Sequence, residues 1–180
     1  LARYNQVLDI SKADLANLIS QVEHGAYQKK LKSMLCKNIM TTEVVYVDLN
    51  SPLDRAWKLL RNHHVKALPV TDADRKVIGI ITLEDFIKSS TVDFHQTIGQ
   101  RIRGFMRSAA PGLNSLPNIV WQAMSKPVKV ISEDRNMLDL AEIFCGDGHH
   151  HIPVVNANQQ LVGMITQSDF VQAIDRSAIY

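Results

Sequence analysis

The sequence predicts an α+β fold built from two repeats, each with the element order β-α-β-β-α. Three observations predict it: two fifty-residue segments match without a gap, short apolar runs alternate with amphipathic stretches, and polar turns separate them. One such repeat buries too little surface to fold alone. We therefore expect two small sheets, each covered by helices on one side and packed about a pseudo-twofold axis, with an extra N-terminal helix and a helical linker.

The repeat appears when residues 39–88 are laid over residues 123–172, a constant shift of 84 positions. Ten of the fifty aligned positions are identical, whereas average composition would give about three. The identical pairs include Pro69/Pro153, Gly79/Gly163, Thr82/Thr166 and Asp85/Asp169. We place the N-terminal helical segment at 1–36, the first repeat at 37–90, the linker at 91–120 and the second repeat at 121–180.

Each repeat is expected to open with a short strand and an amphipathic helix. The strands are predicted at 43–47 and 127–131. In the first helix, Ser51 is the expected N-cap and Pro52 occupies the first helical position. The second helix has the apolar positions Met137, Leu140, Ala141, Ile143 and Phe144 and ends at Gly146.

A strand, a polar turn, a further strand and a helix complete each repeat. The predicted strands are 67–71 and 77–81 in the first repeat, and 152–155 and 161–165 in the second. The final helices are expected to open at Thr82 and Thr166, which can cap them.

Two helical stretches lie outside the repeats. Residues 11–35 carry a variant capping box, Ser11 with Asp14, and an apolar stripe. Residues 89–122 place Arg101, Arg103 and Arg107 among apolar residues. That pattern fits either a basic helix on an acidic membrane surface or a short helix packed on the repeats with solvated arginines.

Composition narrows the class of protein. The chain has 180 residues, 46% of them hydrophobic, which is the ordinary globular range. Its net charge of +2 excludes a generally polybasic protein, so nucleic acid is not an expected partner. Cys36 and Cys145 are too few for a disulfide framework, which favours a reducing cytoplasmic compartment. Of these two cysteines, we expect Cys36 at a helix end and Cys145 as a buried small side chain.

No run of about 18 apolar residues is present that would span a bilayer, and no signal peptide is recognisable. The chain starts at Leu1 rather than Met. We expect it to be a fragment whose upstream sequence bears on its function.

The strand endings GIITLED and GMITQSD, each after a strand reading KALPV or HHIPV, resemble the CBS domain family. Two such copies in one register resemble a Bateman module. The flank DISKADLANLISQVEHGAYQKKLKSMLCKNIM is similar to the soluble C-terminal part of HPP family proteins, in which a membrane domain precedes a CBS pair. That resemblance implies a cytoplasmic-face regulatory domain. A free-standing CBS protein, or the regulatory tail of another membrane protein or enzyme, is the alternative.

The pattern Gly-x-x-Thr-x-x-Asp has a chemistry of its own. The threonines Thr82 and Thr166 stand at a strand-to-helix switch, where unpaired helical N–H groups can hold an anion such as phosphate. Asp85 and Asp169 follow by one turn, and a carboxylate there can accept two hydrogen bonds from vicinal ribose hydroxyls. Alternatively, each threonine merely caps its helix and each aspartate is a favourable first-turn acid.

The resemblance implies further site residues. It gives Lys66 and His150 as basic phosphate contacts, with Val65 and His149 bordering the base. Base contacts from the opening strands would be Thr42 and Val44, and Lys126 and Val128. Site 1 is thus expected to contain Thr42, Val44, Val65, Lys66, Thr82 and Asp85, and site 2 Lys126, Val128, His149, His150, Thr166 and Asp169. Both are expected as clefts between the repeats.

The two sites differ in charge. Lys66 in the first copy is accompanied by Glu84, an anion that opposes a polyphosphate. The second copy has Ser168 at that position and the run His149-His150-His151, but Lys126 departs from the small hydroxyl residue common in the family. We therefore expect the second site to bind a phosphorylated adenosine more tightly, increasingly so toward the ordinary histidine pKa of about 6.5.

Other chemistry is weakly supported by the sequence. Adjacent strand residues point to opposite faces, so three consecutive histidines cannot face one metal ion, and His149 with His151 lack further ligands. No Walker loop, HExxH, nucleophile elbow or CxxC motif occurs, and we expect no enzyme and no resident cofactor.

The sequence therefore predicts a regulatory CBS pair that binds AMP, ADP or ATP, with S-adenosylmethionine as a further candidate. It would form a homodimer and control an attached, membrane-embedded domain through its N-terminal helix. The competing interpretation is a ligand-independent dimerisation or interaction module with vestigial clefts.

Overall fold

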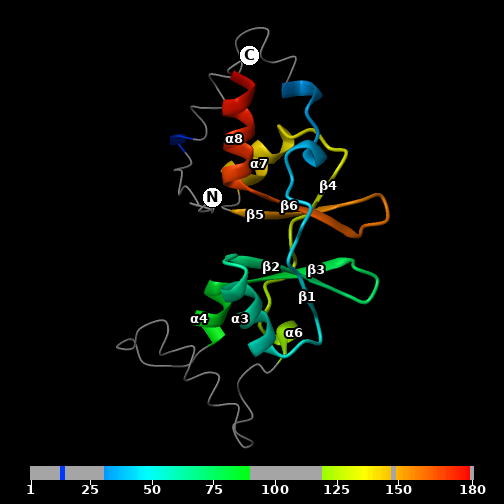
Figure 1. Cartoon of the computed structure of the whole chain (residues 1–180), viewed down its shortest axis with the longest axis vertical. Coiled ribbons are helices and arrows are strands. Elements are labelled where there is room, and N and C mark those ends of the chain that lie inside the picture. Colours follow the sequence, from blue (N-terminus) through cyan, green and yellow to red (C-terminus); the bar gives the residue numbers. More distant parts are fainter. Residues whose placement is uncertain (1–12, 15–30, 90–118, 147–148, 179–180) are drawn as a thin grey trace, which may run out of the picture. The chain divides into compact units, whose positions relative to one another are not determined.

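The computed structural model describes residues 13–14, 31–89, 119–146 and 149–178 (Figure 1). The chain divides into two compact units. Unit 1 comprises residues 1–44 and 129–180, and unit 2 comprises residues 45–128. The units therefore do not coincide with the repeats, because the residues that precede each repeat's first strand belong to the unit formed by the other repeat.

Unit 2 is a three-stranded mixed sheet with its helices on one face (Figure 1). Strand β1 runs parallel to β2, and β2 runs antiparallel to β3. The strands are β1 (Val47–Asp48), β2 (Ala67–Thr71) and β3 (Val77–Thr82). The helices are α3 (Leu53–Asn62), α4 (Leu83–Ser89) and α6 (Val120–Ala123).

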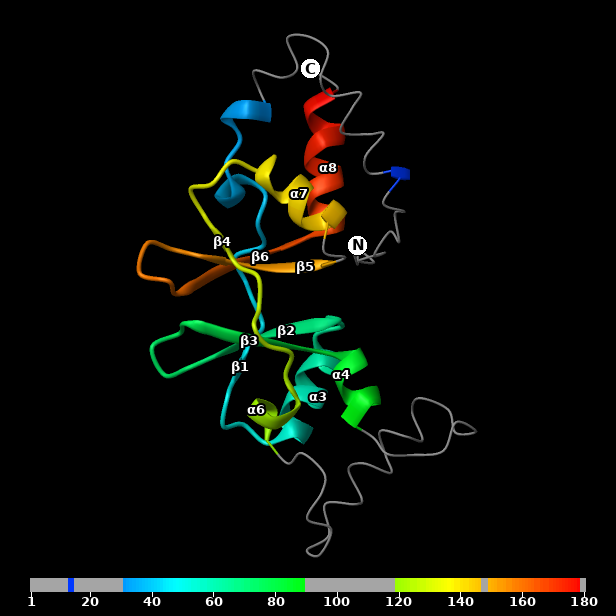
Figure 2. The ribbon, with the colours of Figure 1, turned by 180° about the vertical axis from the view of Figure 1, so that it is seen from behind.

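Unit 1 repeats this architecture, as the view from behind shows (Figure 2). Strand β4 is parallel to β5, and β5 is antiparallel to β6. The strands are β4 (Ile131–Ser132), β5 (His151–Val155) and β6 (Leu161–Thr166). The helical elements are the 3-10 turn η1 (Cys36–Asn38), α7 (Asp139–Gly146) and α8 (Gln167–Ala178). The α+β class and the order of the elements agree with the prediction.

Each unit has its own apolar core. In unit 1 the fully buried side chains of Leu140, Ile152 and Phe170 pack with Leu31 and Cys36 from the N-terminal segment. In unit 2 the core is formed by residues from β1, α3, β2, β3, α4 and α6, namely Val47, Leu53, Ala56, Leu60, Leu68, Val70, Ile81, Phe86, Val120 and Met124. The predicted apolar helix faces therefore point inward, since burial of such side chains is the main driving force for packing.

The duplication extends to backbone detail. The β2–β3 ladder shifts register between Val70 and Thr71, and the β5–β6 ladder shifts at the equivalent Val154 and Val155. In the turns that follow, Arg75 and the equivalent Gln159 both have a φ of 63°. The two hairpins share the register irregularity and have a left-handed residue at the equivalent position, which confirms that the 84-residue shift is a structural repeat.

Most predicted strands are confirmed, but the opening strands are not. Strand β2 spans the predicted residues, and β3, β5 and β6 each extend one residue further than predicted. The opening strands were predicted at 43–47 and 127–131, yet β1 and β4 are two-residue strands that start at Val47 and Ile131. The reason is that the chain passes from one unit to the other at residues 44–45 and 128–129, which interrupts strand pairing.

Two local predictions were wrong. Ser51 does not cap α3: the N-cap is Pro52 and no side-chain capping bond is present, while the Ser51 carbonyl accepts a hydrogen bond from Val120 N. Cys145 is also less buried than expected, whereas Cys36 lies at a helix end, as expected. Cys36 is fully buried at the start of η1, and Cys145 near the end of α7 is half-buried.

The predicted N-terminal helix and linker lie mostly outside the described residues. Residues 13–14 and 31–33 are helical, whereas Arg101, Arg103 and Arg107 are not described. Within the described ranges, the helices are all too short or too polar to cross a membrane.

Candidate functional site

Each repeat ends in the same clamp between a threonine and an aspartate. In unit 2, Asp85 Oδ2 accepts hydrogen bonds from Thr82 N at 2.7 Å and from Thr82 Oγ1 at 2.8 Å. In unit 1, Asp169 Oδ2 accepts them from Thr166 N at 2.8 Å and from Thr166 Oγ1 at 2.7 Å. The last residue of a strand is thus fixed to the first turn of the following helix in both copies.

The clamp in unit 1 is a reciprocal capping box. Asp169 N also donates to Thr166 Oγ1, at 3.2 Å, so the threonine caps the helix while the aspartate side chain caps the threonine. The predicted capping role of Thr166 is therefore confirmed. The aspartate carboxylate keeps one oxygen, Oδ1, for other partners.

The two aspartates differ in what that second oxygen does. Asp85 Oδ1 accepts a hydrogen bond from Ser125 Oγ at 2.7 Å, and Asp85 is 5% exposed. Asp169 is half-buried, and its Oδ1 has no hydrogen-bond partner among the described residues. A carboxylate oxygen without a partner remains available to a ligand, so unit 1 presents the more open of the two clamps.

The helix N-termini are less open than the sequence suggested. Besides the clamp bonds, Gln167 N donates to His150 O at 3.2 Å and Leu83 N to Lys66 O at 3.4 Å. The expectation that these N–H groups are unpaired was therefore wrong at Thr82, Leu83, Thr166, Gln167 and Asp169. At the two threonines and Asp169 the cause is local, since a motif with aspartate three residues after threonine satisfies its own donors. Leu83 N and Gln167 N donate instead to the carbonyl groups that precede β2 and β5.

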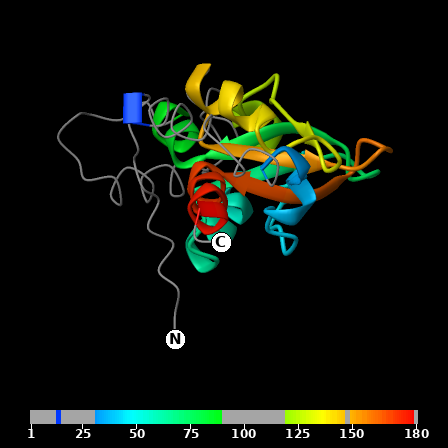
Figure 3. The same cartoon turned by 90° about the horizontal axis from the view of Figure 1, so that it is seen from above.

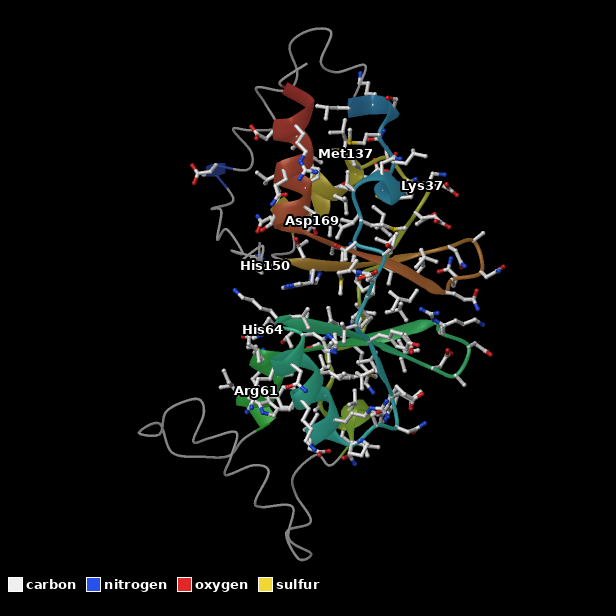
Figure 4. All side chains as sticks on the ribbon, viewed as in Figure 1. Lys37, Arg61, His64, Met137, His150 and Asp169 are labelled. Carbon is white, nitrogen blue, oxygen red and sulfur yellow. The ribbon has the colours of Figure 1, made fainter. Side chains whose placement is uncertain are left out.

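Two buried polar side chains, those of Gln167 and Ser168, lie at the start of α8. Gln167 is 4% exposed, and its Oε1 lies 3.1 Å from His150 Nδ1. Ser168 is 8% exposed, and its hydroxyl has no hydrogen-bond partner among the residues that the structure describes. With the amide oxygen facing Nδ1, the proton of a neutral His150 ring is on Nδ1, and Nε2 is left as an acceptor. Figure 4 labels His150 just before β5 and Asp169 on α8.

The predicted base contacts are regrouped by the structure. Thr42 and Val44 belong to unit 1, together with Thr166 and Asp169, although the sequence assigned them to site 1 with Thr82 and Asp85. Lys126 and Val128 likewise belong to unit 2, with Thr82 and Asp85. The grouping agrees with two equivalent bridges just before the first strand of each repeat: Thr41 pairs with Met164 in unit 1, and Ser125 pairs with Ile80 in unit 2.

Lys126 has a partner that the sequence did not indicate. Its Nζ lies 3.3 Å from the ring centroid of Trp121, a cation–π contact on the surface of unit 2. Trp121 is 43% exposed, so this pair is in solvent.

The other predicted contacts are split between the two units. Val65 is half-buried and Lys66 is exposed, both in unit 2 with Thr82 and Asp85. His149 and His150 are exposed in unit 1. Among the described residues, no group of three histidine, cysteine, aspartate or glutamate side chains is arranged to hold a metal ion.

The motif glycines make room for protein rather than for a ligand. A Cβ on Gly79 would lie 2.5 Å from the Met124 sulfur, and one on Gly163 would collide with the Met40 sulfur. In each unit, therefore, a thioether from the residues just before the first strand of the other repeat fills the space above the glycine.

A cavity of about 390 Å³ opens beside Asp169 in unit 1. It is lined by Met34, Asn38, Ile39, Met40, Asp169, Gln172, Ala173 and Arg176. We call this cavity the α8 groove. Apart from Asp169, none of its lining residues was among the predicted site residues. Residues 34–40 precede the first strand of the first repeat, and Gln172, Ala173 and Arg176 follow the Gly-x-x-Thr-x-x-Asp motif.

Comparisons with known proteins agree with this architecture. The family model described as CBS domain matches residues 36–91 and 120–176, more than half of the chain. The crystal structure of CBSX2 from Arabidopsis thaliana in complex with AMP superposes with a TM-score of 0.62 at 20% identity, covering 79% of this chain and 97% of that one.

Two further solved structures are similar. The CBS domain pair of protein MJ0100, in complex with 5′-methylthioadenosine and S-adenosyl-L-methionine, gives a TM-score of 0.60 at 22% identity over 79% of this chain and 97% of that one. The CBS domain of a membrane protein from Sphaerobacter thermophilus gives 0.63 at 23% identity over 86% and 96%. These similarities establish a shared fold.

Proposed function

The chain belongs to the CBS domain family, and on that premise we propose that it senses an adenosine nucleotide of the AMP, ADP or ATP type. The observation that carries the proposal is Asp169, whose Oδ2 is fixed by Thr166 and whose Oδ1 is available. A carboxylate held in this way can accept hydrogen bonds from the two hydroxyls of a ribose. The adenosine ligands of CBSX2 and MJ0100 support this choice of ligand class.

We further propose that binding regulates an attached domain. A ligand shifts a conformational equilibrium only through different affinities for the two states, so the bound and free forms must differ in the attached elements. Residues 31–40 are the natural route, since Met34, Asn38, Ile39 and Met40 line the cavity beside Asp169 and this segment connects to the N-terminal residues. The regulated partner would be a membrane domain upstream of Leu1, and the module would form a homodimer.

The competing function is supported by unit 2. Both oxygens of Asp85 accept hydrogen bonds from the protein, and the side chain is buried. An aspartate in this state stabilises the junction between β3 and α4 without any ligand. If unit 1 were equally inert, the chain would be a ligand-independent interaction module.

Ligand-dependent thermal unfolding distinguishes the two functions. We expect AMP, ADP or ATP to raise the midpoint, since a ligand at 100 times its Kd adds about 2.7 kcal/mol to the free energy of unfolding. For a chain of this size that corresponds to roughly 5–10 °C. S-adenosylmethionine and 5′-methylthioadenosine complete the panel. A midpoint that no member of the panel moves would favour the interaction module.

Two matched variants locate the site. Asp169→Asn should abolish the ligand-induced rise in midpoint while changing the unliganded midpoint little. Asp85→Asn should lower the unliganded midpoint but retain the rise. The opposite pattern would place the ligand in unit 2. The upstream membrane domain is tested by the sequence before Leu1, where we expect about four apolar spans long enough for a bilayer.

A further inference from the structure

The α8 groove offers a complete set of contacts within unit 1. Asp169, Gln172, Ala173 and Arg176 follow the spacing i, i+3, i+4, i+7, so they form one face of α8 that lines the cavity. The opposite wall comes from the segment Met34–Met40. Figure 3, which looks nearly along α8, shows that segment and α7 on different sides of the helix.

The chemistry of the walls is that of a nucleotide site. The thioethers of Met34 and Met40 and the side chain of Ile39 provide an apolar wall for a flat ring. Asn38 uses its Oδ1 to accept a hydrogen bond from Leu35 N at 2.9 Å, which leaves its amide N–H groups as donors toward the nitrogen acceptors of a base. The volume of about 390 Å³ is within the range of small-molecule sites.

Arg176 is the cation of this groove. It is exposed, and its guanidinium has no ion-pair or hydrogen-bond partner among the described residues. Seven residues separate it from Asp169, about 10 Å along the axis at about 1.5 Å per residue. Helical side chains lean toward the N-terminus, so the long Arg176 side chain shortens that separation toward the length of a ribose phosphate.

The other candidates for a phosphate contact in unit 1 are less suitable. The N–H groups of Thr166, Gln167 and Asp169 are all bonded within the protein. The Nδ1 atom of His150 lies 3.1 Å from Gln167 Oε1, so that nitrogen already has a partner within the protein. Arg176, in contrast, is always charged and can bind a phosphate with two parallel N–H groups.

We propose that a nucleotide in unit 1 lies along α8, with its ribose on Asp169 and its phosphate on Arg176. This inference rests on the proposed adenosine-binding function and adds the residue that selects for a phosphorylated ligand. The selection is specific to unit 1, because the 84-residue shift places Val92 at the position of Arg176.

Paired titrations with AMP and adenosine test this assignment by isothermal calorimetry. Arg176→Gln should weaken AMP binding by about 10- to 100-fold, the worth of a charge-assisted hydrogen bond or pair, and leave adenosine binding unchanged. Arg176→Lys should recover part of the loss. Arg61→Gln is the matched control, since Arg61 is likewise an exposed arginine in the last turn of its helix, α3, and should affect neither ligand.

His150→Ala completes the experiment and should leave the AMP-to-adenosine affinity ratio as in the wild type. Wild-type binding of AMP with an unchanged ratio in Arg176→Gln would overturn this inference alone. A ratio that collapses in His150→Ala instead would also overturn it. Failure of the wild-type chain to bind either AMP or adenosine would overturn the proposed function together with it.

Discussion

Replacement of Gly79 by alanine should destabilise unit 2 through one identifiable contact. A Cβ at that position would lie 2.5 Å from the Met124 sulfur and 3.1 Å from the Ser125 carbonyl oxygen. Real Cβ atoms do not approach so closely, so Met124 must move. Because Met124 is 6% exposed and belongs to the core of unit 2, it cannot move without disturbing that core.

The expected magnitude follows from the packing. Forcing an extra methyl group into a well-packed core costs about 1–3 kcal/mol. The cost of displacing Met124 cannot exceed the cost of losing its side chain altogether. Truncation of a buried methionine to alanine, which removes the obstructing sulfur, costs about 2–5 kcal/mol. We therefore expect Gly79→Ala to lower the free energy of unfolding by about 2 kcal/mol and the thermal midpoint by about 4–8 °C.

The assay is unfolding by heat and by urea, with Gly146→Ala as control. Gly146 is the last residue of α7, and a Cβ there would have no neighbour within 4 Å. That substitution should change stability by less than about 1 kcal/mol, in the stabilising direction, because alanine favours the helix. Both variants therefore add the same methyl group, but only the one at Gly79 collides with a neighbouring side chain.

A double-mutant cycle with Met124→Ala isolates the contact. If the Met124 sulfur is the obstacle, Gly79→Ala should cost less in the Met124→Ala background than in the wild type, with a coupling free energy above about 0.5 kcal/mol. Additive effects, or a Gly79→Ala variant as stable as Gly146→Ala, would refute the reasoning.

Three further predictions concern single side chains. Burial raises the pKa of the Cys36 thiol from 9.0 to about 11, with the Asp139 carboxylate adding to the rise. The folded state thus keeps a proton that the unfolded state loses above pH 9. Urea unfolding should therefore show the free energy of unfolding falling by about 2 kcal/mol between pH 9 and 11 in the wild type, and by less in Cys36→Ala. Parallel pH profiles of the two proteins would contradict this. Ser125→Ala should cost about 1–3 kcal/mol in urea because Asp85 loses a donor, whereas Ser125→Thr keeps it; equal losses would count against the bond. Lys126→Ala should cost less than about 1 kcal/mol and Lys126→Arg nearly nothing, since the cation over Trp121 is in solvent; a larger loss would imply a buried role.

The sequence predicted the parts of the fold that depend on local pattern. Strand β2 and the cores of β3, β5 and β6 are apolar runs bounded by turn residues, and their boundaries agree within one residue with the structure. The opening strands failed because their pairing is non-local. Thr41 pairs with Met164 of β6 through an isolated bridge, and the residues that follow it do not extend β1. No periodicity in a single segment contains that information.

The sequence predicted where the candidate site lies, but not the hydrogen bonds that its residues make or the residues that line the groove. The motif located Thr166 and Asp169, and the capping geometry could be inferred from their spacing. The burial of Cys36 was not predicted, because it depends on packing against residues about a hundred positions away. The groove residues Asn38 and Arg176 were missed because they lie before and after the repeated motif.

The two aspartates show where ligand selectivity resides. Asp85 and Asp169 occupy the same motif and make the same bonds to threonine. They differ because Ser125 donates to Asp85, whereas the equivalent Thr41 makes no such bond to Asp169 among the described residues. Both of these hydroxyl residues come from the residues just before the first strand of the other repeat. The availability of each carboxylate is therefore set outside the motif, so two nearly identical repeats can carry one ligand-binding aspartate and one structural aspartate.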